Sequence, residues 1–135
     1  MPDSTTETLT LARRFFAAIE SGDVATIASI YAPGAVVWHN HDGIAQPVDE
    51  NLATLGAFIA ASRERRYEVS RLAAFEGGFV QQHVLTAVSN KGASFELPAC
   101  VVCKVECGRI TRLDEYFDSA QVQTLIAGLA GEKGA

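Results

Sequence analysis

Residues 94–118, SFELPACVVCKVECGRITRLDEYFD, contain two alternating segments that are separated by a short turn. Successive side chains of a β-strand point to opposite faces of its sheet. Every odd-numbered position from 97 to 105 is apolar, whereas the even-numbered positions of the segment include Glu96, Lys104 and Glu106. The first segment therefore predicts a strand with one face in the core, and Cys107 with Gly108 predicts a tight turn into the next strand.

The second segment, residues 109–118, places one acid on its apolar face. Glu115 shares that face with Thr111, Leu113 and Phe117. Because it is costly to remove a carboxylate from water, Glu115 either has an interior partner, such as His83, or exchanges protons as an acid or base. The opposite face carries Ile110, Arg112, Asp114, Tyr116 and Asp118. We interpret the last three of these as structural.

Helices are expected before these strands, and more strands around them. Apolar residues recur at helical spacing from Leu9 to Ile19, "SGD" at 21–23 predicts a stop and a restart, and "PG" at 33–34 ends the second helix. "AVVWH" predicts a short strand, "NHDGIAQP" a loop, and Pro47 the start of a helix that runs to about Arg66. The remaining elements expected are strands over 67–76, 79–89, 94–106 and 109–118 and a short helix over 119–130. This order predicts an α+β fold with the helices on one side of an antiparallel sheet.

Composition limits the classes of function. The 135 residues suit a single domain, with a core over about 6–120 and a tail over 121–135. A net charge of −5 and scattered Lys and Arg argue against nucleic acid as a partner. No apolar run approaches the roughly 18–20 residues that span a bilayer, and the N-terminus lacks the apolar core of a signal peptide. We therefore expect a cytoplasmic protein without a membrane partner.

Three cysteines lie close together, at positions 100, 103 and 107. The C-x-x-C spacing of Cys100 and Cys103 suggests metal or redox chemistry. In a strand, however, that spacing puts the two side chains on opposite faces, and no second Cys or His pair completes a zinc site. Buried, reduced thiols and no metal are the expectation.

The order of these segments also resembles a known family. "ESGD" between two helices, then "IYAPGAVVWHN", then a meander that ends in "GRITRLDEYFD", resembles the nuclear transport factor 2-like superfamily over nearly the whole chain. More narrowly, the chain resembles its SnoaL-like group, whose relatives include polyketide cyclases, ketosteroid isomerases and limonene-epoxide hydrolases. The resemblance implies a cone-shaped α+β roll with a strongly curved sheet around an apolar pocket. It also implies a homodimer through the outer face of the sheet.

The resemblance implies three catalytic candidates. Glu115 matches an acid–base aspartate of the epoxide hydrolases, and His83 matches an arginine of their charge relay. His39 takes the place of the general base of the ketosteroid isomerases and titrates near neutral pH. The alternative for each is structural: a glutamate held by an interior bond, a satisfied core histidine, and a histidine beside a loop. His41, inside that loop, is expected in solvent.

The resemblance also implies a set of substrate-binding residues. A slip of one residue would put Trp38 and Asn40, rather than His39, in line with pocket residues of the epoxide hydrolases. Since such a slip reverses the strand faces, only one of these sets can line the pocket. The other expected lining residues are Phe15, Leu85, Val101 and Phe117.

Neither named reaction carries over intact. Phe15 and Val101 stand where the ketosteroid isomerases hold their oxyanion donors, and Leu85 replaces the second aspartate of the hydrolase relay. The leading hypothesis is an enzyme without a cofactor that transfers protons on an apolar, oxygen-bearing small molecule. The alternative is a non-catalytic ligand-binding or association domain of the same fold.

Overall fold

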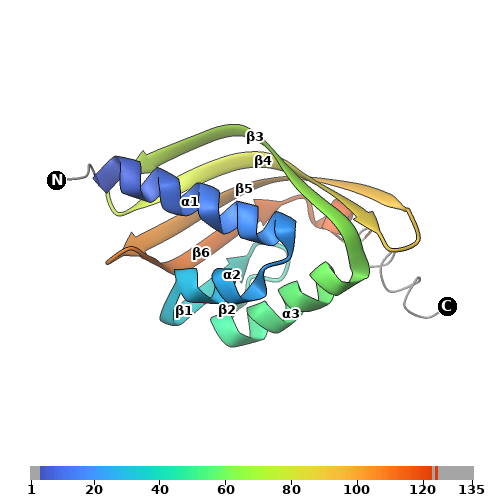
Figure 1. The fold of residues 1–135 in the computed structure, drawn as a ribbon, viewed down its shortest axis with the longest axis horizontal. Helices are drawn as coiled ribbons and strands as arrows, with labels where there is room; N and C mark the ends of the chain where they lie inside the picture. Colours follow the sequence, from blue (N-terminus) through green and yellow to red (C-terminus); the bar gives the residue numbers. More distant parts are fainter. Residues whose placement is uncertain (1–3, 123, 125–135) are drawn as a thin grey trace.

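The computed structural model describes residues 4–122 and 124, and in it helices pack against one face of a curved sheet (Figure 1). The helices are α1 (Ser4–Ser21), α2 (Val24–Ile30) and α3 (Val48–Ala61). The strands are β1 (Tyr31–His39), β2 (Ala45–Pro47), β3 (Ser62–Phe75), β4 (Gly78–Ser89), β5 (Ser94–Glu106) and β6 (Arg109–Phe117). Their order in the sheet is β2-β1-β6-β5-β4-β3, antiparallel throughout except for the parallel pair of β1 and β6. The predicted α+β roll is confirmed.

The first two helices meet where the sequence predicts. Gly22 adopts φ +77°, a left-handed conformation that glycine reaches without strain, and it lies just past the end of α1. Asp23 then caps α2, since its carboxylate accepts a hydrogen bond of 3.1 Å from the backbone N–H of Thr26. This reversal places α2 beside α1 in the helical layer (Figure 1).

The third helix is shorter than predicted. It ends at Ala61, and Ser62–Phe75 form β3, so the expectation of a helix as far as Arg66 is wrong. Ser62 caps the helix, since its Oγ donates to the Phe58 carbonyl (2.7 Å), and Arg65 adds bonds from its Nε to the Ile19 carbonyl (3.0 Å) and from its NH1 to the Ile59 carbonyl (3.3 Å). Carbonyls at helix ends have no partner within the helix, so one extended arginine here serves the ends of both α1 and α3.

One other local prediction also needs correction. The loop predicted at "NHDGIAQP" contains the short strand β2, which pairs with β1 over Val36–Trp38. Residues 119–122 and 124 are helical, and the rest of the helix predicted over 119–130 lies outside the described residues.

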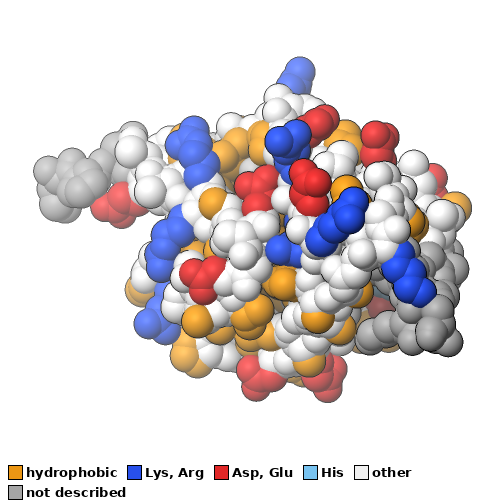
Figure 2. Space-filling view, turned by 45° about the vertical axis from the view of Figure 1, so that its right-hand side comes forward, with side chains coloured by type: hydrophobic (Ala, Val, Ile, Leu, Met, Phe, Trp, Pro, Cys, Tyr) orange, Lys and Arg blue, Asp and Glu red, His pale blue; other side chains and the backbone are white. Residues whose placement is uncertain are grey.

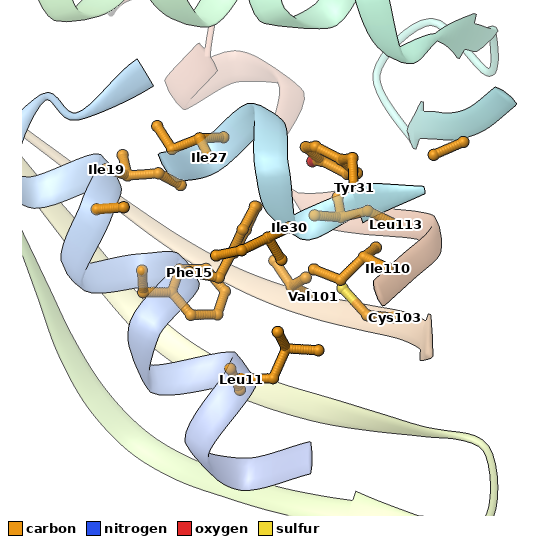
Figure 3. Packing of buried hydrophobic residues seen from close by; sticks show 14 of the residues in the cluster. Leu11, Phe15, Ile19, Ile27, Ile30, Tyr31, Val101, Cys103, Ile110 and Leu113 are labelled. Atoms are coloured by element: carbon orange, nitrogen blue, oxygen red, sulfur yellow. The ribbon is translucent and has the colours of Figure 1, made fainter. Parts of the chain in front are cut away.

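The main hydrophobic core lies between the helices and the inner face of the sheet. Figure 3 shows Phe15 of α1 and Ile30 of α2 turned toward Val101 and Cys103 of β5. Ile110, predicted on the outer face, is fully buried in this core. The pairing register of β6 shifts against β1 between Tyr31 and Val36 and against β5 between Lys104 and Val105. Such a shift turns the side chains before it to the other face of the sheet, so the alternation read from residues 112–118 does not extend to Ile110.

The cysteines differ in burial. Cys103 is completely buried, and burial raises the pKa of its thiol, whereas Cys100 on the opposite face is half-buried. The prediction of opposite faces for these two is confirmed. Cys107 is exposed in the turn before β6, so the expectation of burial does not hold for it.

Charged side chains cover the edge of the sheet at β3. Exposed charges on an edge strand disfavour pairing with a second sheet. Figure 2 shows positive and negative side chains interspersed over one face of the molecule. The exposed charged residues of β3 are Arg63, Glu64, Arg66, Glu68 and Arg71.

Among the described residues, no helix is long and apolar enough to cross a membrane.

Candidate functional site

His39 and Glu115 form an ion pair on the inner face of the sheet. The parallel register of β1 and β6 puts these two residues side by side, next to the buried pair of Val37 and Leu113. His39 Nε2 lies 3.2 Å from Glu115 Oε1, and the two side chains are 20% and 22% exposed. Glu115 therefore has an interior partner, but that partner is His39 and not His83.

The surroundings of His39 favour its protonated form. Burial alone would lower the pKa of this imidazole. The hydrogen bond from Nε2 to Glu115 and the negative charges of Glu115 and Asp42 act in the opposite direction, and the net result is a raised pKa. A histidine with a raised pKa holds a proton at neutral pH more often than a free one, which suits it to share a proton with the adjacent carboxylate.

The register also decides between His39 and its two neighbours. Trp38 points to the outer face, where its ring centroid lies 5.2 Å from that of Tyr116. Asn40 closes the end of the β1–β6 ladder: its Nδ2 donates to the Phe117 carbonyl and its Oδ1 accepts from the Phe117 N–H, both at 3.0 Å. The inner face at this point belongs to His39, and the side chains of Trp38 and Asn40 are occupied elsewhere.

Phe117 and His41 complete the surroundings of the ion pair. Phe117 lies 5.8 Å from the His39 ring and 5.4 Å from the His41 ring, centroid to centroid. His41 is half-buried, so the expectation that it lies in solvent is wrong. The apolar Phe117 ring lowers the local dielectric on one side of the pair, which strengthens its electrostatic interaction.

His83 lies deeper on the same face, on β4, and is 3% exposed. Its Nδ1 lies 3.0 Å from the side-chain Nε2 of Gln81. Its own Nε2 is buried and has no hydrogen-bond partner among the described residues. Burial lowers the pKa of this imidazole, and the charge of Glu115 offsets the effect only in part. His83 is therefore held in its neutral form.

Tyr67 and Gln81 are site residues that sequence reasoning missed. The Tyr67 ring packs against His83 (4.7 Å between centroids) and against Phe16 of α1 (4.9 Å). Burial raises the pKa of the Tyr67 phenol, and the charge of Glu115 raises it further, so the hydroxyl keeps its proton. Gln81 carried a usable signal, since it precedes His83 by two residues and so shares its strand face. Tyr67 carried none, because it is only the first residue of the strand predicted over 67–76.

The remaining predicted lining residues divide between two clusters. Phe15 and Val101 are 2% exposed and belong to the main core, and Val101 pairs with Glu115 in the sheet. Leu85 belongs to a second cluster, with Leu97 and Val122, against which Phe117 and Tyr67 pack. Tyr67 packs against both clusters and so joins the deep core to this second one.

Two clefts open on the surface of the described part of the chain. One, of about 880 Å³, lies between the start of α1 and the turns after β3 and β5. The other, of about 710 Å³, lies between the end of α2, the start of β1 and the start of α3. Neither is lined by His39, His83 or Glu115. In the residues described, no three His, Cys, Asp or Glu side chains are grouped as a metal ion requires.

Comparisons with known proteins place the fold. The model of the SnoaL-like domain family matches residues 12–113. An LEH-like epoxide hydrolase from M. tuberculosis superposes with a TM-score of 0.77 at 19% identity, over 95% of this chain and 96% of that one. PrhC from Penicillium brasilianum NBRC 6234 superposes with a TM-score of 0.84 at 15% identity, over 97% and 93%.

A putative SnoaL-like polyketide cyclase from Jannaschia Sp. CCS1 gives a TM-score of 0.77 at 14% identity, over 92% of this chain and 94% of that one. Comparison with curated proteins finds no match. At these identities the similarity of the solved structures shows the shared fold alone.

Proposed function

Because the chain belongs to the SnoaL-like domain family, within the nuclear transport factor 2-like superfamily, we propose that it binds an apolar, oxygen-bearing small molecule. It then transfers protons on that molecule, in an isomerisation, cyclisation or hydration that needs no cofactor. The observation that carries the proposal is the ion pair of His39 and Glu115, 3.2 Å apart on a largely apolar inner face. The similar structures named as an epoxide hydrolase and a polyketide cyclase support this class of chemistry.

The ion pair supplies an acid and a base in one place. The Glu115 carboxylate accepts a proton from the substrate, and the His39 imidazolium, hydrogen-bonded to it, donates one to the position that gains electrons. The catalytic form is the pair with one proton between the two side chains, which the raised pKa of His39 favours. The Phe117 ring beside His39 shields the pair from water on one side.

The second cluster forms the apolar wall of the proposed site. Phe117 and Tyr67 pack against the cluster that contains Leu85 and Leu97, and Leu85 lies on the same face of β4 as His83. Phe15 and Val101 form the floor, since both belong to the buried core. Trp38 does not line the proposed site, because its ring lies on the outer face of the sheet. Asn40 does not line it either, because its side chain is bonded to the backbone of Phe117.

We also propose a homodimer through the outer face of the sheet. That face presents the Trp38–Tyr116 ring pair, and Tyr116 is 47% exposed. Half-buried Val84 and Val102 share the face with these rings. An aromatic pair among valines is typical of an interface core. Light scattering checks the proposal, because Tyr116→Glu would yield monomers only if this face holds the dimer together.

A second candidate is a binding domain without catalysis. It is favoured by the way in which His39 and Glu115 satisfy each other, and by the location of both clefts away from them. Such a domain would be stabilised by its ligand and would show no turnover.

One experiment separates the two candidates. The protein is screened for thermal stabilisation by small epoxides, ketosteroids and polyketide-like aromatic compounds, and any binder is then tested for turnover. Glu115→Gln removes the base and keeps the shape, and we expect it to slow turnover by about 10²–10⁴-fold. Asp114→Asn is the matched control, because Asp114 lies on the outer face of the same strand and pairs with Arg112. If Glu115→Gln turned over a confirmed substrate at the rate of the wild type, Glu115 would not be the base.

A further inference from the structure

The Nε2 atom of His83 is a buried polar atom whose bonding capacity is unused. His83 is 3% exposed, and no described residue bonds to this nitrogen. Burying a polar group without a partner is unfavourable, and folded proteins leave few such groups. Nε2 is on the far side of the imidazole from the backbone, and the side chain projects from the inner face of β4. The atom therefore points into the interior between the sheet and the helices, where the ring packs against Phe16 and Tyr67.

Gln81 decides which nitrogen of His83 carries the proton. The Gln81 side-chain amide lies 3.0 Å from Nδ1 through its nitrogen, which can only donate. Nδ1 must then be the acceptor, and in a neutral imidazole the proton resides on Nε2. Gln81 is itself 1% exposed, so water does not compete for its amide. The unused atom of His83 is thus a hydrogen-bond donor.

The surroundings keep His83 neutral. The ring is packed between Phe16 of α1, with centroids 5.5 Å apart, and Tyr67 of β3, at 4.7 Å. Glu115 on β6 is the acidic group whose charge reaches it, and this effect does not outweigh burial. A neutral donor favours an uncharged acceptor, because a buried anion would require a positive charge to balance it.

We propose that His83 is a neutral hydrogen-bond donor, fixed in its Nε2–H tautomer by Gln81, for the carbonyl oxygen of an uncharged ligand on the inner face of the sheet. This deepens the proposed function and rests on it for the location of the ligand. It names the substrate class as ketones or esters, whose oxygen accepts and does not donate. His83 would also supply a hydrogen-bond donor on the inner face, where the side chains of Phe15 and Val101 have none.

The positions of His83 and Glu115 suit opposite ends of one small molecule. Gln81 pairs with Val101, which pairs with Glu115, whereas His83 lies one row further, level with Ala99 and Phe117. With β5 between them and one row of offset along the strands, the two residues stand about 12 Å apart on the sheet, measured at the backbone. A ligand between them has its carbonyl at His83 and an adjacent or conjugated C–H bond toward Glu115.

The chemical step balances within the site. The C–H bond breaks, its proton goes to the Glu115 carboxylate, and its electron pair moves through the enolate to the carbonyl oxygen. The hydrogen bond from Nε2–H then strengthens as charge gathers on that oxygen, which is the condition for stabilising a transition state. Return of the proton to another carbon completes an isomerisation with no other reactant.

Nitrogen-15 NMR of the whole ¹⁵N-labelled chain tests the tautomer without any assay of activity. We expect His83 at neutral pH to show a protonated Nε2 and an unprotonated Nδ1, with Gln81→Leu converting this into a mixture of tautomers. His83→Leu assigns the signals among the three histidines. A proton on Nδ1, or an imidazolium at neutral pH, would overturn the proposal.

A pair of matched probes tests the donor. Acetophenone and α-methylstyrene have the same shape, and only the first carries a carbonyl oxygen. Replacing His83 by Leu should lower the affinity for acetophenone about tenfold relative to the affinity for α-methylstyrene, because one hydrogen bond is lost. Gln82→Leu, on the exposed outer face of the same strand, should leave the ratio unchanged. The same ratio in wild type and His83→Leu, or no binding of either probe to the wild type, would contradict the proposal.

The Gln81→Leu/His83→Leu variant guards against a loss of folding, because it removes the donor and its partner together. It should show the same altered ratio as His83→Leu. The two proposals fail in different ways. Unchanged turnover in Glu115→Gln would remove the proposed base while leaving the tautomer and the probe ratio intact. An unchanged probe ratio would remove the role of His83 while leaving the effect of Glu115→Gln intact.

Discussion

Asn40 and Phe117 exchange two hydrogen bonds of 3.0 Å, one from the Asn40 amide to the Phe117 carbonyl and one from the Phe117 N–H to the Asn40 side chain. The Asn40 N–H also donates to the Glu115 carbonyl, at 3.1 Å. These bonds continue the parallel ladder of β1 and β6 past the last residue of β1. They hold the backbone on both sides of the ion pair of His39 and Glu115.

Asn40→Ala should therefore disturb the ion pair as well as stability. We expect a loss of about 1–2 kcal/mol in the free energy of unfolding, measured in urea, because two hydrogen bonds are removed at an exposed site. The pKa of His39, followed by NMR, should fall toward its usual value as Glu115 moves away. Asn90→Ala is the control, since its side chain also bonds a backbone carbonyl, that of Ala60, far from the pair. A change in the His39 pKa with Asn90→Ala would point to a general loss of order instead.

Protonation of His39 should stabilise the fold at low pH. The folded-state pKa of His39 is raised, so the folded state binds this proton more tightly than the unfolded chain. The stabilisation is full below the unfolded pKa of about 6.5 and disappears as pH rises through the folded pKa. Glu115→Gln should abolish this loss of stability with rising pH in urea unfolding between pH 5.5 and 8.5. If the slope persisted in that variant, the ion pair would not be its source.

The titration of His83 should make the fold less stable at low pH, the opposite of the effect of His39. Its folded-state pKa is lowered, so the unfolded chain binds more protons between the two pKa values. This contribution is present above about pH 6.5 and is lost as pH falls. In Glu115→Gln the profile should therefore rise with pH, and in His83→Leu it should fall with pH. Identical profiles in the two variants would exclude opposed histidines.

Gln81 and His83 should show strong coupling in stability. Each single change to Leu leaves the other side chain buried without its partner, which costs about 1–3 kcal/mol. The double variant has no unpaired group and should be more stable than either single variant, as a double-mutant cycle in urea would measure. Additive losses would mean that the two side chains do not depend on each other.

Arg65→Lys should destabilise the protein by about 2 kcal/mol, because a lysine cannot reproduce the fork of donors that serves the ends of α1 and α3. Arg63→Lys, at an exposed position of the same strand, should change the free energy of unfolding by less than about 0.5 kcal/mol. Equal effects in thermal or urea unfolding would assign the loss to strand propensity and not to the carbonyl contacts.

The ends of elements were harder to predict than the elements themselves. The helical spacing in α1 and the alternation in β5 are each repeated over several turns or residue pairs, so one exceptional residue does not change the predicted element. The end of α3 involves Ser62, which caps it, and Arg65, which also bonds carbonyls of another helix. No pattern within residues 48–66 shows that the end of α1 lies beside this segment. The burial of Ile110 likewise depends on a register shift that two other strands impose.

The sequence by itself determined which residues share a face. Alternation placed Glu115 with Leu113, and His83 with Phe79 and Gln81, because side-chain direction in a strand is a local property. The tertiary structure alone decided which of these residues meet. The parallel pairing of β1 with β6 joins segments far apart in the chain, and it brings His39, rather than His83, to Glu115. It also leaves His83 with Gln81 and one unpaired nitrogen. Strand order and register arise from packing across the whole sheet, and local periodicity cannot encode them.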